Sequence, residues 1–426
     1  MYATVACLTG RVIAPPVLLF FRMPSRMVFN PILTLLAAVA VLVVGQQAVR
    51  HIGFLRTFNI PVPVVGGLIA TVIVTLLRTL GIELSFYGGL QEPFMLLFFG
   101  TIGLAADIKL IRAGGRALLL FFALVVVLLV LQDLVGVGIA SAFGLDPLLG
   151  LLGGSITMSG GHGTGAAWAG VFGERYGIDN AFELAMACAT FGLVFGSLIG
   201  GPAAHFLIRR MKARGEPIRT SAPETDTEAV AAGNSGATQN VTSANVLPAL
   251  AILLVGIALG HWLTGVSEGT VFYLPTFVWV LFTTIVIGNV SRMTGLYRPH
   301  GPSVAEIGNL SLSIFLALAL MSLKLWELAG LAGPILVILI AQLVLVFVYT
   351  TQVTYRLMGR DYDAAVLVAG NCGFGMGATP TAIANMQAVT DQHGPSRLAF
   401  IIVPVVGGFL IDIANAFIIK GFIAFF

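Results

Sequence analysis

Two glycine-rich stretches, near 147–170 and 363–387, hold the residues best suited to bind a small ligand. Glycine leaves backbone N–H and C=O groups accessible. The interspersed hydroxyl and amide side chains offer oxygen ligands to a small cation and donors to a carboxylate. The candidates in the first stretch are Ser155, Thr157, Ser159, Gly161, His162, Gly163, Thr164 and Gly165, and those in the second are Asn371, Gly373, Gly375, Gly377, Thr379, Thr381 and Asn385.

The glycines also predict local structure in the first stretch. Four of the six residues at 160–165 are glycine, which disfavours a helix there. A helix beginning after Gly165 would direct its positive end toward an anion. Asp146 and Pro147 are typical of an N-cap and first turn. His162 allows either a substrate contact or a structural hydrogen bond.

The second stretch also predicts a helix that begins after a glycine-rich run. Pro380 suits the first turn of a returning half-helix, with Thr379 as its N-cap. Thr381 and Asn385 lie four residues apart, on one helix face. The alternative for these glycines is close helix packing. Packing is the favoured interpretation for a separate GxxxG series, Gly192, Gly196 and Gly200.

A carboxylate in the last apolar run is the strongest cation candidate. Asp412 and Asn415 share a helix stripe with Gly408. A carboxylate in mid-span costs roughly 2.5 to 3.5 kcal/mol on insertion scales, so it should face the protein interior and bind sodium or an ammonium group. A polar pair that only packs helices is the alternative. Asp133, beside Gln132 and nearer a span end, fits an interfacial structural role as well as a functional one.

Composition places the chain in a membrane. It is 58% hydrophobic and 10% charged, and its mean hydropathy is +0.98, whereas soluble domains carry about 25% charged residues. The net charge of +3 does not imply nucleic acid. No Walker motif, HExxH or Ser/His/Asp order occurs, and the three cysteines have no metal spacing, so we expect neither an enzyme nor a cofactor.

The chain also carries a weak internal repeat at a shift of 212 to 215 residues. Fused repeats with glycine-broken segments in matching places are typical of secondary transporters. The aligned landmarks are Ile60-Pro61 with Leu274-Pro275, the segment 108–115 with 323–330, and 161–166 with 373–378.

Apolar runs predict about ten membrane spans, five in each half. The fold class we expect is an all-α integral membrane protein of two inverted-topology repeats. Each repeat has five transmembrane helices and a re-entrant hairpin, formed by the glycine-rich stretches. The runs lie near 31–49, 62–80, 93–106, 116–142, 183–208, 246–264, 272–290, 304–322, 331–355 and 396–424.

The distribution of basic residues predicts the orientation. With both termini outside, fifteen of the 22 Lys and Arg residues fall in cytoplasmic loops, in line with the positive-inside rule. The first hairpin then enters from outside and the second from inside. The fifteen are Arg50, Arg56, Lys109, Arg112, Arg116, Arg209, Arg210, Lys212, Arg214, Arg219, Arg292, Arg298, Arg356, Arg360 and Arg397.

Composition shifts divide the chain into four parts. Residues 1–30 read as a signal-like leader or a mis-assigned start, with translation beginning at Met23 or Met27. Residues 31–208 form the first repeat and 246–426 the second. Between them, 209–245 is polar and rich in Gly, Ser and Thr, which predicts a flexible cytoplasmic linker.

The motifs resemble those of the bacterial sodium/glutamate symporter family from about Met27 onward. The resemblance implies sodium-coupled uptake of L-glutamate, a homodimer and periplasmic termini in the inner membrane. Before Met27 the chain departs from the family pattern. The residues that carry the resemblance are the runs SGGHGTGAAW at 159–168, GFGMGATPTAIANMQ at 373–387 and IDIANA at 411–416.

The residues give the implied substrate a physical rationale. Glutamate carboxylates suit half-helix N-termini and the hydroxyls of Ser159, Thr164, Thr379 and Thr381. Its ammonium, or a sodium ion, suits Asp412 with Asn415. The mechanism expected is alternating access, with sodium as the coupling ion. A carrier for another carboxylate such as citrate, or a sodium/proton exchanger, remains the alternative.

Overall fold

The structure is a computed structural model that describes residues 26–57, 60–214, 241–270, 273–322 and 332–426. Most of the expected leader and linker lies outside these residues. Within 209–245, α8 extends to Ala213 and α10 begins at Ser243, so both ends of the expected linker are helical. A short parallel pairing joins β1 (Arg26–Val28) to β2 (Glu83–Ser85).

The described residues contain nine helices long and apolar enough to cross a membrane, and these confirm nine of the ten predicted spans. The tenth, α4 (Gln91–Ala105), is a shorter helix of 15 residues. The nine spans are α1 (Pro31–His51), α3 (Val62–Thr79), the main part of α5 (Ile108–Ala142), α8 (Ala181–Ala213), α10 (Ser243–Ser267), α11 (Thr276–Thr294), α12 (Gly301–Met321), the run α13 to α14 (Ala332–Leu357) and the run α17 to α18 (Arg397–Ile423).

The remaining elements are short. Two of them interrupt the long apolar runs as π-helical turns, and the others connect spans or belong to the glycine-rich stretches. They are α2 (Gly53–Thr57), η1 (Gly88–Leu90), α6 (Pro147–Leu151), η2 (Leu152–Ile156), α7 (Gly161–Tyr176), η5 (Thr350–Thr354), α14 (Tyr355–Leu357), α15 (Tyr362–Met376), α16 (Thr379–His393) and η6 (Val406–Leu410).

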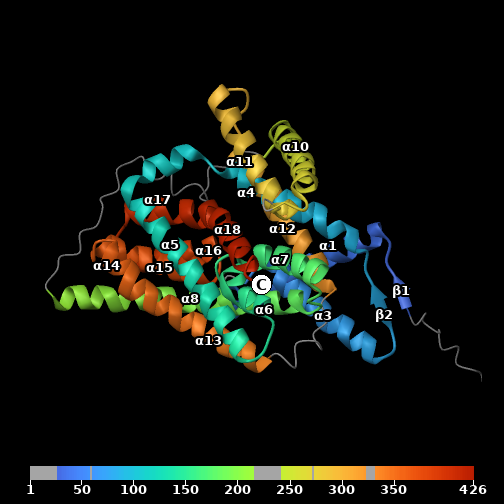
Figure 1. Cartoon of the computed structure of the whole chain (residues 1–426), viewed down its shortest axis with the longest axis horizontal. Helices are drawn as coiled ribbons and strands as arrows, with labels where there is room; N and C mark the ends of the chain where they lie inside the picture. Colours follow the sequence, from blue (N-terminus) through green and yellow to red (C-terminus); the bar gives the residue numbers. More distant parts are fainter. Residues whose placement is uncertain (1–25, 58–59, 215–240, 271–272, 323–331) are drawn as a thin grey trace, which may run out of the picture.

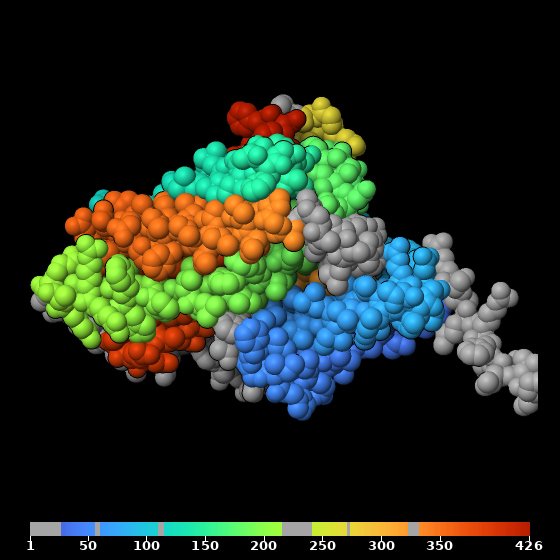
Figure 2. All heavy atoms as spheres, turned by 90° about the horizontal axis from the view of Figure 1, so that it is seen from below, coloured from blue at the N-terminus to red at the C-terminus, as the bar shows by residue number. Residues whose placement is uncertain are grey.

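The helices pack into two groups. One group, called the outer group here, contains α1, α3, α4, α10, α11 and α12. The central group contains α5 to α8 and α13 to α18. In Figure 1 most of the central group lies on the left, and in Figure 2 α8 and α13 lie side by side, apart from the blue N-terminal helices. Corresponding elements of the two halves join the same group, and both glycine-rich stretches lie in the central group.

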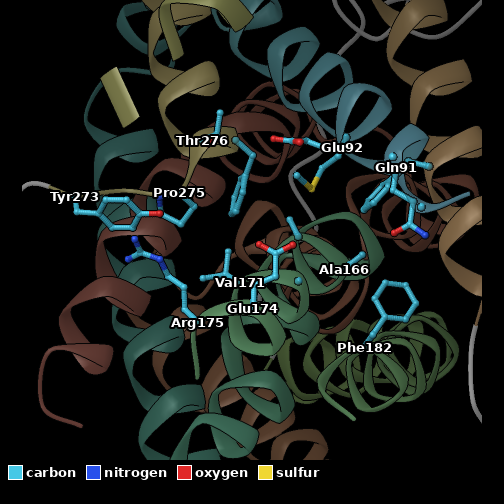
Figure 3. Close-up of a pocket in the computed structure, with 17 residues that line it drawn as sticks. Gln91, Glu92, Ala166, Val171, Glu174, Arg175, Phe182, Tyr273, Pro275 and Thr276 are labelled. Atoms are coloured by element: carbon cyan, nitrogen blue, oxygen red, sulfur yellow. The ribbon is translucent and has the colours of Figure 1, made fainter. Parts of the chain in front are cut away.

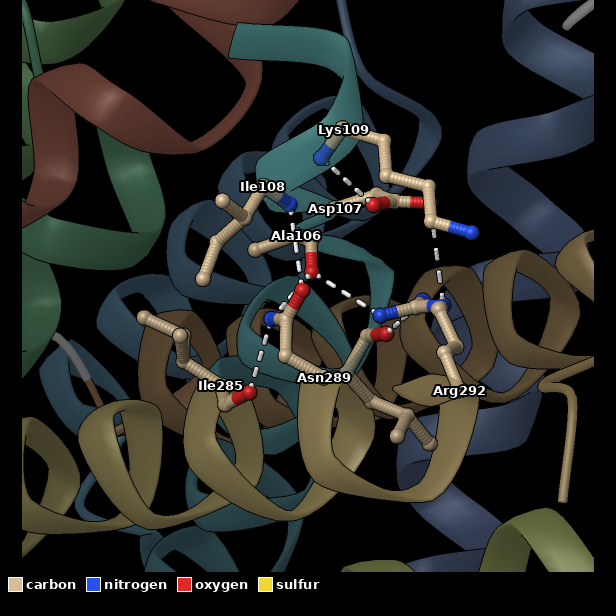
Figure 4. A network of polar contacts seen from close by, with 8 residues as sticks. Ala106, Asp107, Ile108, Lys109, Ile285, Asn289 and Arg292 are labelled. Carbon is tan, nitrogen blue, oxygen red and sulfur yellow. Dashed lines mark hydrogen bonds and ion pairs between the residues drawn. The ribbon is translucent and has the colours of Figure 1, made fainter. Parts of the chain in front are cut away.

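A polar network fixes the junction where the chain passes from the outer group to the central group (Figure 4). Arg292 on α11 donates to the carbonyl oxygen of Ala106 at 3.0 Å, just after α4. Asn289 donates to the same oxygen at 2.9 Å and accepts from the Ile108 amide at 3.0 Å. Gly115 then interrupts α5 with φ +57°, a conformation that favours glycine. The junction is therefore held at α11 and bent at Gly115.

Candidate functional site

The first glycine-rich stretch is two short helical arms separated by a turn at 159–160. Asp146 caps α6, as predicted, by accepting from the Leu148 amide at 2.8 Å. The prediction that no helix forms over 160–165 was wrong, because α7 begins at Gly161. The backbone instead bends at Gly154, and Gly161 itself has φ +66°.

The second stretch has the same form, with α15 and α16 separated at 377–378. Pro380 lies in the first turn of α16, as predicted. The prediction that Thr379 is the N-cap was wrong: Ala378 occupies that position and makes no side-chain cap. Thr379 is the first helical residue, and its hydroxyl donates to the Gly407 carbonyl at 2.6 Å.

Close packing explains why glycines fit inside these helices. A Cβ on Gly373 would lie 2.4 Å from the Ala382 Cα, and one on Gly163 would lie 2.6 Å from the Phe98 ring. Each glycine makes helix formation about 1 kcal/mol less favourable than alanine would. Close contacts that only glycine permits offset this loss. Gly192 and Gly200 pack equally closely against the second stretch, which confirms the packing interpretation of the GxxxG series.

A buried carboxylate meets the first stretch at the bend. Asp133 Oδ1 accepts from the Ser155 amide at 2.8 Å, and its Oδ2 lies 2.9 Å from Ser155 Oγ. Ser155 Oγ is also 2.6 Å from Asn415 Oδ1, while Asn415 Nδ2 donates to the Ser155 carbonyl at 3.1 Å. The side chains of all three residues are buried. Asp133 is therefore fully buried and in contact with a residue of the candidate site. The choice between an interfacial structural role and a functional one stays a prediction.

Gln132, the neighbour of Asp133, joins the two glycine-rich stretches. Its Oε1 accepts from Ser159 Oγ at 2.7 Å, and its Nε2 donates to the Gly375 carbonyl at 2.7 Å. Gln342 donates to the Gln132 carbonyl at 2.7 Å. This chain of buried hydrogen bonds places the two breaks against one another in the central group.

Asp412 contacts a different residue of the first stretch. Its Oδ1 lies 3.5 Å from Thr164 Oγ1, at the limit of a hydrogen bond, and the residue is half-buried. Asp412 and Asn415, expected to act together, thus have different partners: Thr164 for the acid and Ser155 for the amide. Both partners belong to the first stretch.

Several other candidates form structural hydrogen bonds. Thr157 donates to the Leu152 carbonyl at 2.6 Å, and Asn385 donates to the Gly196 carbonyl at 2.8 Å. His162 Nε2 lies 3.1 Å from the hydroxyl of Thr190, which favours the structural alternative for this histidine.

The buried side-chain oxygens without a hydrogen-bond partner among the described residues include three in the central group: Asn371 Oδ1, Thr381 Oγ1 and Gln342 Oε1. Asn371 uses only its amide nitrogen, which donates to Thr354 at 3.2 Å. A buried polar atom without a partner costs stability, so each such atom needs an explanation. Asn371 and Thr381 lie on opposite arms of the second stretch, where a bound ligand could supply the missing hydrogen bonds.

A cavity of about 400 Å³ separates α7 from the outer group (Figure 3). It reaches Ala166, two residues beyond Thr164, from one side and Glu92 on α4 from the other. Trp168 of α7 packs against Phe277 of α11 at 5.6 Å between ring centroids, and Phe277 lines the cavity. The cavity is thus bounded by both helix groups and extends to the arm that carries Thr164.

Arg175, in the last turn of α7, contacts the segment just before α11 of the outer group at one edge of this cavity. Its guanidinium carbon lies 3.7 Å from the centroid of the Tyr273 ring, a cation–π contact. The same guanidinium is 3.9 Å from a carboxylate oxygen of Glu268, a largely exposed partner. Burial raises the pKa of the Tyr273 phenol, and nearby Arg175 acts in the opposite direction.

Sequence reasoning missed two groups of residues at this site. Gln132 was noted only as the neighbour of Asp133, and Gln342 was not considered, although an uncharged amide inside a highly apolar run is itself a signal. Glu92, Arg175 and Tyr273 border the cavity, and only the packing of α4, α7 and α11 brings them together. Among the described residues, no cluster of three His, Cys, Asp or Glu side chains could hold a metal ion.

A helical membrane protein with two similar glycine-broken segments, carboxylates inside its helix bundle and a cavity between two helix groups belongs to the class of membrane transporters. A family model described as "Sodium/glutamate symporter" matches residues 27–395. The chain therefore belongs to the sodium/glutamate symporter family.

Curated relatives extend this match over most of the chain. A sodium/glutamate symporter of Escherichia coli (strain K12) is 50% identical over 388 residues, covering 91% of this chain and 96% of the relative. The protein of the same name from Shigella flexneri matches to the same extent. One from Haemophilus influenzae is 44% identical over 393 residues, covering 92% of this chain and 96% of the relative.

Proposed function

We propose that this protein takes up L-glutamate across the bacterial inner membrane together with sodium, by alternating access. Membership of the sodium/glutamate symporter family supports both the substrate and the ion. The observation that carries the proposal is the meeting of the two breaks: Ser159 of the first stretch and Gly375 of the second bind the same buried Gln132. Because residues of both glycine-rich stretches form the site, a movement of either stretch would change its geometry.

The cavity between the helix groups supplies the route for glutamate to this site. It leads past Ala166 toward Thr164 and the N-terminal half of α7, where a carboxylate would meet a hydroxyl and the positive end of a helix. Thr381 and Asn371 offer further partners from the second stretch. Asp412, beside Thr164, suits the ammonium group or a sodium ion.

The charge distribution supports a periplasmic opening of this cavity. Tyr273 and Pro275 line it just before α11 begins, whereas Arg292 lies near the opposite end of the same helix. Arg292 borders a surface recess with Lys109 and Arg298. Under the positive-inside rule the basic end of α11 is cytoplasmic, so the cavity opens outward.

The inverted arrangement, the re-entrant hairpins, the periplasmic termini and the homodimer remain parts of this proposal. Matching caps support the duplication, because Pro61 and Pro275 precede α3 and α11 at corresponding places in the halves. Neither arm of a glycine-rich stretch is long enough to span, since α7 and α15 have 16 and 15 residues. Arms of this length fit hairpins that enter and leave on one side.

Glutamate uptake into proteoliposomes with an imposed sodium gradient tests the function. We expect uptake that needs inward-directed sodium and stops when a sodium ionophore collapses the gradient. Competing citrate and other dicarboxylates should leave it largely unaffected. Sodium-driven citrate uptake, or sodium/proton exchange without glutamate, would contradict the proposal in favour of one of the two alternatives.

A further inference from the structure

We propose that Asp133, Ser155 and Asn415 form a sodium site that is separate from Asp412, and that Asp412 holds a second sodium ion, so that two cations accompany each glutamate. This inference rests on the proposed function and deepens it. Its evidence is the geometry of the triad formed by these three side chains, which come from α5, η2 and α18.

With Asp133 ionised, the triad lacks one hydrogen. Three side-chain oxygens meet here, because Asp133 Oδ2 and Asn415 Oδ1 lie 2.9 and 2.6 Å from Ser155 Oγ. The serine hydroxyl has a single hydrogen and can satisfy only one of these two neighbours. The Asn415 amide cannot help, because its nitrogen donates to the Ser155 carbonyl at 3.1 Å. A cation among these oxygens removes the conflict, since all three can then be ligands.

An ionised Asp133 also calls for a cation. The side chain is fully buried, and no ion pair with Asp133 occurs in the described part of the chain. A buried carboxylate without a counter-charge is costly, and two hydrogen bonds from Ser155 offset only part of this cost. Carboxylate, hydroxyl and amide oxygens are hard ligands of the kind that small alkali and alkaline-earth cations prefer.

The triad and Asp412 use different partners, which separates the two acidic centres. Asp133 contacts Ser155 before the break in the first stretch, whereas Asp412 contacts Thr164 after the break. Asp412 is half-buried, whereas Asp133 is completely enclosed. The break lies between Ser155 and Thr164 in the sequence. A movement of the break when glutamate binds would therefore change the surroundings of both acids.

Two sodium ions per glutamate would give the cycle a net charge. Glutamate near neutral pH is a monoanion, so two sodium ions carry one net positive charge inward. Such a step gains about 2.3 kcal/mol for each 100 mV of membrane potential. Uptake would then respond to voltage as well as to the sodium gradient.

The test compares Asp133→Asn and Ser155→Ala with a matched control, Asp363→Asn. Asp363 is a second acid bonded to a serine, with Ser396 Oγ 2.6 Å away, and it lies outside the triad. The measurements on purified full-length protein are radioactive sodium bound per chain at saturating glutamate, the stabilisation by sodium against heat, and charge moved per glutamate in proteoliposomes.

We expect the wild type and the control to bind two sodium ions and move one positive charge per glutamate. Asp133→Asn should lose one sodium ion and show a weaker thermal shift with sodium. Ser155→Ala keeps the backbone contact to Asp133, and it should weaken sodium binding at this site about tenfold, or about 1.4 kcal/mol. It serves as the second variant if Asp133→Asn fails to fold.

The results separate the two proposals. Wild-type protein without sodium-driven glutamate uptake would overturn the proposed function itself. Wild-type uptake with unchanged sodium binding and charge in both triad variants would overturn only the sodium site. If one sodium ion were bound and one net charge moved per glutamate, the second cation would be a proton. That result would also overturn the proposed sodium site.

Discussion

The two glycine-rich stretches have the same backbone plan but different electrostatics. Both are pairs of short helical arms with a central break, and both pack through glycines. Each of the acids near the breaks, Asp133 and Asp412, nevertheless contacts the first stretch. The second stretch instead presents neutral groups, with unpartnered oxygens on Asn371 and Thr381. The two stretches therefore share a backbone form, and under the proposed function the first would bind cations and the second would make neutral polar contacts to the substrate.

The largest expected effect follows from removing the half-buried acid at the first stretch. Asp412→Asn should reduce sodium-dependent glutamate uptake by more than about tenfold, because it removes a negative charge that would be worth several kcal/mol to a bound cation. The measurement is initial uptake in proteoliposomes across a range of sodium concentrations. Unchanged sodium dependence in a well-inserted variant would remove Asp412 from the site.

A packing test compares the glycines of the two stretches. Gly373→Ala should destabilise the protein by at least about 1 to 3 kcal/mol, because its Cβ would meet the backbone of Ala382 at 2.4 Å. Gly163→Ala should cost less, since it meets the movable Phe98 ring. Gly201→Ala, with nothing within 4 Å, is the control. Thermal unfolding in detergent measures the order of stability of the three variants. Equal stability of all three would contradict the expected order.

A third test asks whether the unpartnered oxygens of the second stretch bind glutamate. Thr381→Val removes a hydroxyl with no partner, so folding stability should be retained while the KM for glutamate rises about three- to tenfold. Thr379→Val removes a hydroxyl bound to Gly407 and should lower stability. Uptake kinetics and thermal unfolding of both variants separate the two roles. A normal KM in Thr381→Val would leave its hydroxyl unexplained.

The smallest effect is expected at the edge of the cavity. Arg175→Gln removes the contact with Tyr273, worth about 0.5 to 1 kcal/mol at an exposed site, and should change glutamate uptake by about two- to fivefold. Arg175→Lys keeps the charge and should lie closer to the wild type. Both variants are compared at low and high ionic strength. An effect as large as that of Asp412→Asn would instead place Arg175 at the substrate itself.

Much of the fold could be predicted because lipid imposes a simple rule on sequence. A helix must be apolar over its length to span, so nine spans were recognisable from hydropathy alone. The helices inside the glycine-rich stretches could not be predicted. The propensity of glycine argues against them, and the contacts that compensate, such as that of Gly373 with Ala382, join residues of different arms.

The sequence by itself determined a helical membrane protein, the two stretches where its helices break, and the residue types near those breaks, because hydropathy and glycine content are local properties. Only the tertiary structure decided which polar groups meet. It separated Asn415 from Asp412 by giving each its own partner, and it buried Asp133 against Ser155. The physical reason is that hydrogen bonds inside a protein depend on how helices far apart in the chain pack, and a pattern along one helix does not contain that information.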